Sequence, residues 1–349
     1  MSRNDELSVP DAVRFEAPEL PYRPPILARR PRIALVGCGG IARVHLRAYA
    51  DAGYDVVALH SRTRKSAEAC REAFFPEARV CDSVAELLAV EGLDVVDLTP
   101  HPTDRAPLIE AAIDAGIPAL SQKPLALDLE VARRLVERAE AAGVPLAVNQ
   151  NGRFAPHLAW AREAVRAGLL GEIHTVRISI QWDHNWVVGT AFDQDPDLVL
   201  RDFGIHWFDL VAALVVSDPV EVEASVFRTP SQMARPPLSA SVRIRFADAQ
   251  ASLDFDGDSR WGPQDATTVL GTRGTLRCSG PSLEDQRVVL ATEAGFCEPR
   301  LEGSWFPGAF HGAMAEFLDA VWTGREPIHS ARQNLRSLEL CERALSALR

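Results

Sequence analysis

The sequence predicts an α/β protein that begins with a doubly wound parallel sheet and continues into an α+β domain with an open, mainly antiparallel sheet. Two observations predict the first part: short apolar strands alternate with helices up to about residue 150, and a glycine-rich turn follows the first strand. Beyond residue 150 the pattern changes to alternating polar and apolar runs, which predicts the second part. With 349 residues, the chain is long enough for two domains. We place an extended Pro-rich arm at 1–30 and the two domains at 31–150 and 151–349.

The first strand, the turn and the first helix lie between Arg32 and Ala42. Gly37 permits a sharp turn, Gly39 lets a pyrophosphate approach the backbone, and Ala42 lets the helix pack closely on the strand. The free N–H groups at the start of the helix would face the phosphates. A G-x-G-x-x-A pattern also occurs in ordinary turns, but the flanking strand and helix favour a Rossmann-type dinucleotide site. Its predicted contacts are Gly37, Gly39, Gly40, Ile41 and Ala42.

The remaining elements of the first domain follow in alternation. Further strands are predicted at 55–59, 78–81, 93–98, 118–121 and 145–148, and helices after Asp82/Ser83 and at 107–115 and 128–142. Gly116 and Gly143 end the last two helices. Repeated β-α units of this length predict parallel strands joined by right-handed crossovers.

The second domain opens with a helix predicted at 156–167. Strands are predicted at 174–182, 220–228, 239–247, 250–256, 266–271, 274–278 and 287–291, and helices at about 203–215, 311–322 and 331–347. The last helix is expected to pack back on the first domain. Because a large apolar face seldom stays bare, we expect a homodimer or homotetramer formed through the open sheet.

Composition excludes several classes of protein. The net charge of −11 and the lack of a Lys/Arg cluster argue against a nucleic-acid partner. No apolar run approaches the ~18–20 residues that span a bilayer, and the run after Arg29-Arg30 is too short for a signal sequence. We therefore expect a cytoplasmic protein without a membrane partner. The cysteines at 38, 70, 81, 278, 297 and 341 fit no zinc spacing, so we expect reduced thiols and no metal site.

Ligands of open α/β sheets bind at the carboxyl ends of the strands, which directs attention to two loops. The loop after the fourth strand carries Thr99, Pro100 and His101, which we expect beside the nicotinamide ribose, although a Pro-rich loop is also compatible with a plain turn. The loop after the fifth strand carries Gln122 and Lys123 before a proline. An inward-pointing ammonium there would bind a substrate hydroxyl or stabilise a developing alkoxide. The alternative is a solvated surface lysine.

The second domain contributes Asp202 and His206. An Asp and a His four residues apart share one face at the start of a helix, opposite the apolar stripe that contains Trp207. Such a histidine can take a hydroxyl proton as hydride leaves, and the carboxylate would orient the ring. The alternative is an ordinary helix cap with a local contact.

Together these segments resemble the Gfo/Idh/MocA oxidoreductases. The resemblance rests on four motifs in order: Gly37-x-Gly39-x-x-Ala42-x-x-His45, Ala115-Gly116 with Gln122-Lys123-Pro124, Asn151-Gly152-Arg153-Phe154-Ala155-Pro156, and Asp202-x-Gly204-x-His206-x-x-Asp209. It covers residues 31–349. The resemblance implies a Rossmann domain, a lysine–aspartate–histidine catalytic set at Lys123, Asp202 and His206, and a sugar or cyclitol substrate. The predicted cofactor contacts also include Gln122, Lys123 and Asn151.

Two positions depart from the family pattern. The family usually has Glu-Lys-Pro where this chain has Gln122, and relatives often carry a histidine where this chain has Asp104. The first difference affects how Lys123 is held or charged. The second puts a detailed copy of the family's cofactor contacts in doubt.

The end of the second strand bears on the choice of cofactor. NAD enzymes tend to carry an acid there for the ribose 2′-OH, whereas this chain has Ser61, Arg62 and Arg64. A hydroxyl and two guanidinium groups suit a 2′-phosphate, so NADP is preferred and NAD is the alternative. In that alternative Arg62 stacks on the adenine.

Substrate contacts are predicted at Trp182 and Trp186, because Trp faces stack on sugar rings, and at Lys123, Asp202 and His206. The competing interpretation of the tryptophans is a core pair. Arg153 either reaches the cleft or buttresses the domain junction. We expect an NAD(P)-dependent oxidoreductase acting on a secondary alcohol of a sugar, cyclitol or related polyol. The alternatives are a relative that cleaves glycosides through transient oxidation and a non-catalytic NAD(P)-binding sensor or scaffold.

Overall fold

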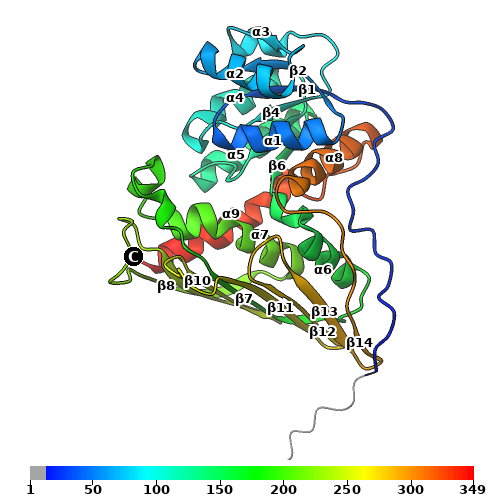
Figure 1. Cartoon of the computed structure of the whole chain (residues 1–349), viewed down its shortest axis with the longest axis vertical. Helices are drawn as coiled ribbons and strands as arrows, with labels where there is room; N and C mark the ends of the chain where they lie inside the picture. Colours follow the sequence, from blue (N-terminus) through cyan, green and yellow to red (C-terminus); the bar gives the residue numbers. More distant parts are fainter. Residues whose placement is uncertain (1–12) are drawn as a thin grey trace, which may run out of the picture.

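The computed structural model describes residues 13–349, and its first sheet has six strands (Figure 1). The strand order is β3-β2-β1-β4-β5-β6 and every pair is parallel, as the sequence predicts. The strands are β1 (Arg32–Val36), β2 (Asp55–His60), β3 (Arg79–Val80), β4 (Val95–Leu98), β5 (Ala119–Gln122) and β6 (Leu146–Asn149). The order reverses between β1 and β4, so a crevice opens where the carboxyl ends of these two strands diverge.

Five helices flank this sheet: α1 (Gly40–Asp51), α2 (Arg64–Phe74), α3 (Val84–Leu88), α4 (Pro102–Asp114) and α5 (Leu129–Ala142). The side chains of Thr63, Ser83 and Asp128 accept hydrogen bonds from the first turns of α2, α3 and α5. The predicted start of α4 at residue 107 is wrong. Its first residue is Pro102, a favoured first helical residue, and Pro107 lies inside the helix.

The second sheet has eight strands in the order β14-β13-β12-β11-β7-β10-β9-β8. The strands are β7 (Ile173–Gln181), β8 (Pro219–Phe227), β9 (Ser239–Phe246), β10 (Gln250–Asp256), β11 (Gln264–Gly271), β12 (Gly274–Gly280), β13 (Arg287–Thr292) and β14 (Gly295–Cys297). Only β7 and β10 pair in parallel. The mainly antiparallel sheet predicted from the alternating runs is confirmed, with β14 as an additional strand.

Helices lie between the two sheets and cover the inner face of the second one (Figure 1). In this layer, α6 contacts β12, α7 contacts β7 and α9 contacts β8. The helices are α6 (Pro156–Arg166), α7 (Ile205–Leu214), α8 (Gly308–Thr323) and α9 (Ala331–Ala347), and short turns form at Asn151–Phe154, Asn185–Val187, Ala191–Gln194 and, as a π-helix, Val199–Phe203. Inward side chains such as Ile178, Val242 and Leu253 are buried.

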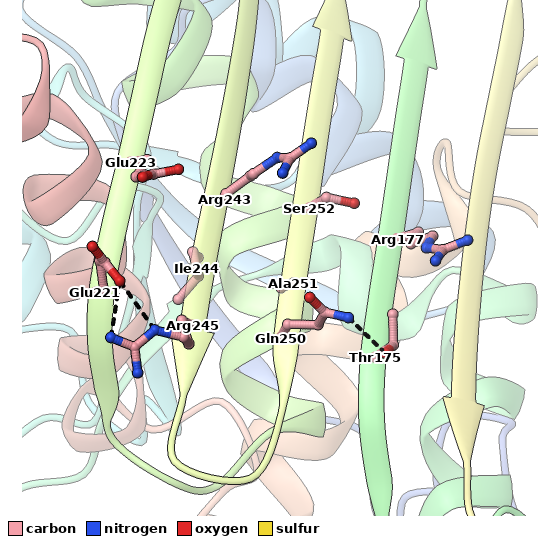
Figure 2. A pocket seen from close by; sticks show the side chains of 10 residues that line it. All are labelled: Thr175, Arg177, Glu221, Glu223, Arg243, Ile244, Arg245, Gln250, Ala251 and Ser252. Atoms are coloured by element: carbon pink, nitrogen blue, oxygen red, sulfur yellow. Dashed lines mark hydrogen bonds and ion pairs between the residues drawn. The ribbon is translucent and has the colours of Figure 1, made fainter.

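The outer face of the second sheet is polar, so the expected large apolar face is wrong. Figure 2 shows charged and hydroxyl side chains projecting from neighbouring strands around a hollow of about 370 Å³. Arg245 donates to Glu221 at 2.9 Å, and Gln250 donates to Thr175 at 3.5 Å (Figure 2). Strict alternation places apolar residues inward and these polar residues outward. Assembly through this sheet stays a prediction, but the apolar face on which we based it is not present.

The two last helices join the first sheet to the second. On α8, Phe310, Met314 and Phe317 belong to the same buried cluster as Ile33 of β1 and Leu46 of α1. The last helix, α9, contacts α5 and β6. The domain boundary at residues 150 and 151 stays a prediction, because core contacts cross it.

Residues 13–31 form an arm that runs along one edge of the molecule towards β14 (Figure 1). Arg14 forms a β-bridge with Phe296, and at the other end Arg29 binds Asp94 at 3.0 Å and lies over the Trp322 ring. The part of the predicted arm at 1–12 lies outside the described residues.

Within residues 13–349, no helix is long and apolar enough to cross a membrane. In the same part of the chain, no cluster of His, Cys, Asp and Glu side chains has the arrangement of a metal site. All six cysteines are unpaired, and Cys38 alone among them is half-buried rather than buried.

Candidate active site

A cleft of about 730 Å³ lies at the carboxyl ends of β1, β2 and β4. Gly37 has a φ of +92°, and a Cβ there would lie 2.9 Å from Pro100 and from the Thr99 hydroxyl. At Gly39 and Gly40 a Cβ would meet no atom within 4 Å, so the backbone faces open space. A tight turn with an open backbone at the start of α1 fits the pyrophosphate of a dinucleotide.

The structure brings some of the predicted cofactor residues to the lining of this cleft, but not Gln122, Lys123 or Asn151. Its lining includes Gly37, Gly39, Ser61, Arg62, Pro100 and His101. The Ser61 hydroxyl accepts from the Cys38 N–H at 3.3 Å, and the Thr99 hydroxyl donates to the Gly37 carbonyl at 2.7 Å. Ala42 is fully buried against the core. The turn is therefore held from the second and fourth strands at once.

The two arginines after β2 differ in their surroundings. Arg64 donates to Glu68 at 2.9 Å and also binds Asp82. Arg62 is exposed at the cleft and has no hydrogen-bond or ion-pair partner among the described residues. One guanidinium is therefore free to meet a ligand at this end of the cleft.

Lys123 and Asp202 meet between the two halves of the chain. The Lys123 Nζ donates to the Asp202 carboxylate and to its backbone carbonyl, both at 2.8 Å. Lys123 follows β5, and Asp202 lies in the π-helix that precedes α7. The side chains are about 15% and 25% exposed, so the pair is shielded but reachable.

His206 lies one turn further along, in the first turn of α7. Its ring stands edge-on to buried Trp305, with centroids 6.0 Å apart, and a Cβ at Gly152 would lie 3.6 Å from its Nδ1. That Nδ1 is buried and has no hydrogen-bond partner in the described part of the chain. No hydrogen bond joins His206 to Asp202 there, so the expected orienting contact is not formed. The π-helix ends before α7 begins, which removes the regular helical spacing between the two residues.

The charges in this group set the protonation states. Burial alone would raise the pKa of Asp202, but the Lys123 ammonium and, less strongly, His206 and His101 hold it below its usual value. Burial and the positive charge of Lys123 lower the pKa of His206 to about 3, against a smaller opposing effect of Asp202. At neutral pH the site therefore holds an ion pair beside an uncharged imidazole.

A buried hydrogen-bonded network behind Lys123 was not predicted. The Gln122 side chain accepts from the Lys123 N–H at 2.7 Å and faces His45 Nε2 at 3.0 Å through its Nε2. His45 Nδ1 lies 2.7 Å from Asp97, which also accepts from the Tyr49 hydroxyl at 2.7 Å. Only His45, in the first motif, points to this network in the sequence, because its members lie on different elements.

Arg105 fixes the same loop from α4. It is fully buried and donates to the backbone carbonyls of Gln122 and Pro124, on either side of Lys123. Burial lowers its pKa to about 9. Lys123 is therefore anchored through its backbone before its side chain reaches Asp202.

The predicted substrate residues separate into two groups. Trp182 packs edge-on against Trp207 and His184, at 5.6 and 5.4 Å between centroids, whereas Trp186 is 56% exposed. His184 stacks on Phe203, next to Asp202, at 3.9 Å. Burial lowers the pKa of His184 to about 4. The loop after β7 thus reaches the catalytic group through His184, with Trp186 at its surface.

Arg153 is placed at the junction rather than in the cleft. Its guanidinium is 5% exposed and binds Asp209 of α7 at 2.5 and 2.9 Å. Arg153 also donates to the Ile328 carbonyl. We predicted either that Arg153 contacts the substrate or that it supports the junction between the domains, and this geometry favours the second role. Asn151, two residues earlier, is 2% exposed in the turn that abuts His206.

Two family models match the chain. Residues 31–150 match the model described as "Oxidoreductase family, NAD-binding Rossmann fold", and residues 158–277 match the model described as "GFO/IDH/MocA C-terminal domain". Together they cover most of the chain.

Curated relatives extend this likeness over nearly the whole length. A D-apiose dehydrogenase from Paraburkholderia graminis is 30% identical over 330 residues, which are 90% of this chain and 86% of the relative. An inositol 2-dehydrogenase from Rhizobium meliloti is 28% identical over 91% of this chain and 96% of its own length. The crystal structure of an oxidoreductase from Agrobacterium radiobacter, in complex with NAD⁺, L-tartaric acid and magnesium, has the same fold. Its TM-score is 0.79 at 24% identity, over 91% of this chain and 96% of that one.

Proposed function

The chain belongs to the GFO/IDH/MocA family of NAD-binding oxidoreductases, and on this basis we propose that it is a dehydrogenase of a sugar, cyclitol or related polyol. The observation that carries the proposal is the Lys123–Asp202 ion pair, 2.8 Å between the charged atoms, set beside the neutral His206. The reaction is the transfer of a hydride and a proton at a secondary alcohol carbon. Such a reaction needs one group that polarises the oxygen and one that holds its proton.

A nicotinamide dinucleotide, when bound in the glycine cleft, supplies the acceptor or donor of the hydride. Lys123 Nζ has three N–H donors, and two of them point to Asp202, so one remains for the substrate oxygen. This ammonium stabilises the negative charge that develops on that oxygen. His206 accepts the hydroxyl proton because its imidazole is uncharged at neutral pH. Asp202 is a positioning residue, since it holds the ammonium in place.

The substrate class follows from chemistry and from the relatives. The characterised relatives are named for D-apiose and for inositol, both polyhydroxylated carbon compounds. Two half-buried side chains lie in the loop after β7. The imidazole of His184 can bind a substrate hydroxyl, and the indole of Trp182 can pack on the C–H face of a sugar ring. We therefore propose a sugar, cyclitol or related polyol as the substrate class.

The test is a panel of sugars, cyclitols and sugar acids, each assayed with NAD⁺ and with NADP⁺ by the absorbance of the reduced nicotinamide. Lys123→Ala and His206→Ala should each lower kcat by about 10²–10⁴-fold, and His206→Ala should leave the dissociation constant of the cofactor unchanged. Lys65→Ala, at an exposed lysine on α2, is the matched control. Wild-type turnover in the Lys123 and His206 variants would overturn the assignment. Cleavage of a glycoside without net reduced cofactor would instead support the transient-oxidation alternative.

The finer proposal is a preference for NADP over NAD. It is supported by the absence of an acid at the end of β2 and by the unpaired guanidinium of Arg62. Arg62→Ala should weaken NADP⁺ binding about 10–100-fold, the value of one or two charge-assisted hydrogen bonds, and change NAD⁺ binding little. Arg64→Ala is the control, because Arg64 is already paired with acids. Equal losses for both cofactors in Arg62→Ala would contradict the preference.

A further inference from the structure

Three loops meet at one end of the second sheet. They follow β7, β8 and β10, and the last residues of these strands fall in one row across the sheet. Each loop presents a large apolar side chain to solvent: Trp186, Met233 and Trp261 are 56%, 63% and 85% exposed. We call these three residues the apolar loop surface. Large apolar side chains that gather at a surface mark a ligand groove or an interface.

A buried polar side chain holds the three loops together. Asn185, which is 4% exposed, donates from its amide to Asp183 at 2.8 Å and to Asp258 at 2.6 Å. Its amide oxygen accepts from the Met233 N–H, also at 2.6 Å. Asp258 accepts in addition from the Thr229 hydroxyl at 2.5 Å. The apolar loop surface is therefore carried by one cross-linked backbone and not by three independent loops.

Trp186 is anchored by its neighbours although more than half of it is exposed. Its indole N–H donates to His184 Nδ1 at 3.3 Å. Its ring packs against Phe192 and Phe203, at 5.9 and 6.3 Å between centroids. Because the N–H is already bonded, Trp186 offers a ligand the flat apolar face of its indole.

The same aromatic contacts lead from Trp186 to the catalytic group. Phe203 directly follows Asp202 in the π-helix and stacks on His184 at 3.9 Å. Burial lowers the pKa of His184, and the carboxylates of Asp183 and Asp202 oppose this effect, so Asp202 lies within electrostatic range of that imidazole. The apolar loop surface thus begins one aromatic ring away from the residue that pairs with Lys123.

We propose that the apolar loop surface binds the second ring of a glycoside, so that the substrate is a sugar or cyclitol that carries a linked sugar. The first ring presents its secondary alcohol to Lys123 and His206, and the second ring packs its C–H face on Trp186. Asp183, exposed beside Trp186, accepts hydrogen bonds from hydroxyls at the edge of that ring. No bond in the second ring is made or broken.

Continuity with the catalytic group favours a part of the substrate as the occupant over a separate protein chain. A sugar ring has apolar C–H faces and a rim of hydroxyls, which match a flat indole with a carboxylate next to it. The inference narrows the substrate class of the proposed function and rests on that function.

The test compares one-ring with two-ring polyols on the full-length chain. The pairs are myo-inositol with galactinol, its galactosyl derivative, and D-glucose with cellobiose and with maltose. Each compound is assayed for kcat/KM at saturating cofactor, and for its dissociation constant by quenching of tryptophan fluorescence. We expect at least one two-ring compound to exceed its one-ring counterpart about tenfold in both measurements, the value of one aromatic stacking contact.

The two proposals fail in different ways. If one-ring compounds are oxidised as well as or better than every two-ring compound, the second-ring inference is overturned and the proposed function stands. If no compound reduces the cofactor, the proposed function fails for this panel. The dissociation constants then decide the inference, which equal affinity for the members of every pair would overturn.

Variants locate the second ring. Trp186→Ala should lower kcat/KM for the preferred two-ring compound about tenfold more than for its one-ring counterpart. Trp186→Phe keeps an aromatic face and should retain part of the preference. The matched control is Trp322→Ala, because Trp322 binds Asp94 just before β4, at the opposite edge of the first sheet from the site. An equal loss for both compounds in Trp186→Ala would contradict the proposal.

Light scattering distinguishes the other occupant, a second copy of this chain. The particle mass of Trp186→Ala should equal that of the wild type. A smaller particle with an unchanged preference for the two-ring compound would assign the apolar loop surface to a contact between protein chains, and would overturn the proposal.

Discussion

His206 and Lys123 illustrate how neighbouring residues determine each other's chemistry. A histidine in water is half protonated near pH 6.5, but here burial and the adjacent ammonium both disfavour the imidazolium. The same ammonium holds Asp202 ionised at 2.8 Å. The ion pair and the neutral base are therefore one electrostatic unit, and a change in Lys123 alters both partners.

The pH profile of alcohol oxidation tests this unit. The pKa of His206 is lowered, so the neutral, proton-accepting form persists as the pH falls, and the acid limb of kcat/KM should lie near 3 rather than 6.5. Lys123→Met should move the limb upward, since one cause of the lowered pKa is lost. Thermal unfolding at each pH separates titration from denaturation. An acid limb near 6.5 in the wild type would contradict the burial and charge argument.

Gln122 supports Lys123 with an amide that has one donor and one acceptor in use. Gln122→Met leaves the Lys123 N–H without its acceptor, whereas His45 Nε2 keeps a second partner, Asn149 Nδ2 at 3.1 Å. The variant should therefore lower the free energy of unfolding by about 1–2 kcal/mol and reduce kcat. Gln122→Glu keeps the acceptor for the Lys123 N–H but replaces the amide NH2 that faces His45 Nε2 with a carboxylate oxygen. We expect a smaller loss of stability and a new pH dependence. Denaturant unfolding and kcat against pH distinguish these outcomes; identical behaviour of the two variants would refute the assigned roles.

At the level of elements, the turn between β1 and α1 contains two glycines with different roles, Gly37 and Gly39. Gly37→Ala puts a side chain at a φ of +92° and 2.9 Å from Pro100, so it should cost stability, about 1–3 kcal/mol, as well as cofactor affinity. Gly39→Ala meets no protein atom, so it should weaken the cofactor and leave the unfolding midpoint unchanged. Thermal unfolding without ligand and cofactor titration separate the two. Equal destabilisation by both variants would show that the turn is not built as described.

Strand β11 carries a buried carboxyl, that of Asp265, whose effect on the free energy of unfolding depends on pH. Burial raises the pKa of Asp265 to about 7, and its Oδ2 has no partner among the described residues. Because the folded pKa exceeds the unfolded one, stability falls as the pH rises from about 4 to 7. Asp265→Asn does not titrate and should gain ~2–4 kcal/mol relative to wild type above pH 7, compared with the difference near pH 4. Urea unfolding at the two pH values measures this; a difference that does not vary with pH would contradict the raised pKa.

The elements also show what sequence patterns can predict. The alternation of β and α segments predicts the parallel sheet, and the period-two runs predict β7–β13. Both predictions succeed because the spacing of apolar residues in a strand depends on whether one or both of its faces are buried. The start of α4 was misplaced because both Pro102 and Pro107 suit a first turn. The Lys123, Asp202 and His206 set came from position and resemblance. The hydrogen bonds of this set could not be predicted from the sequence, because the π-helix and the His45–Gln122 contact depend on tertiary packing.

At the scale of the whole molecule, assembly remains the open prediction. A homodimer or homotetramer through the second sheet would bury the charged face that includes Arg243, Arg245 and Glu221, so its stability should depend on salt. Light scattering at low and high ionic strength should find multiples of 38.1 kDa, with dissociation in Arg243→Glu. A particle of 38.1 kDa under all conditions would rule the assembly out.

The position of α8 has a consequence for how the molecule is made. Phe310, Met314 and Phe317 complete the core that contains β1 and α1, although they are synthesised more than 250 residues later than Ile33. While the ribosome is still translating the second sheet, the nucleotide-binding half lacks part of its interior. Its apolar surface stays available to chaperones during that interval. The interior of this half is therefore complete only near the end of translation, when α8 emerges.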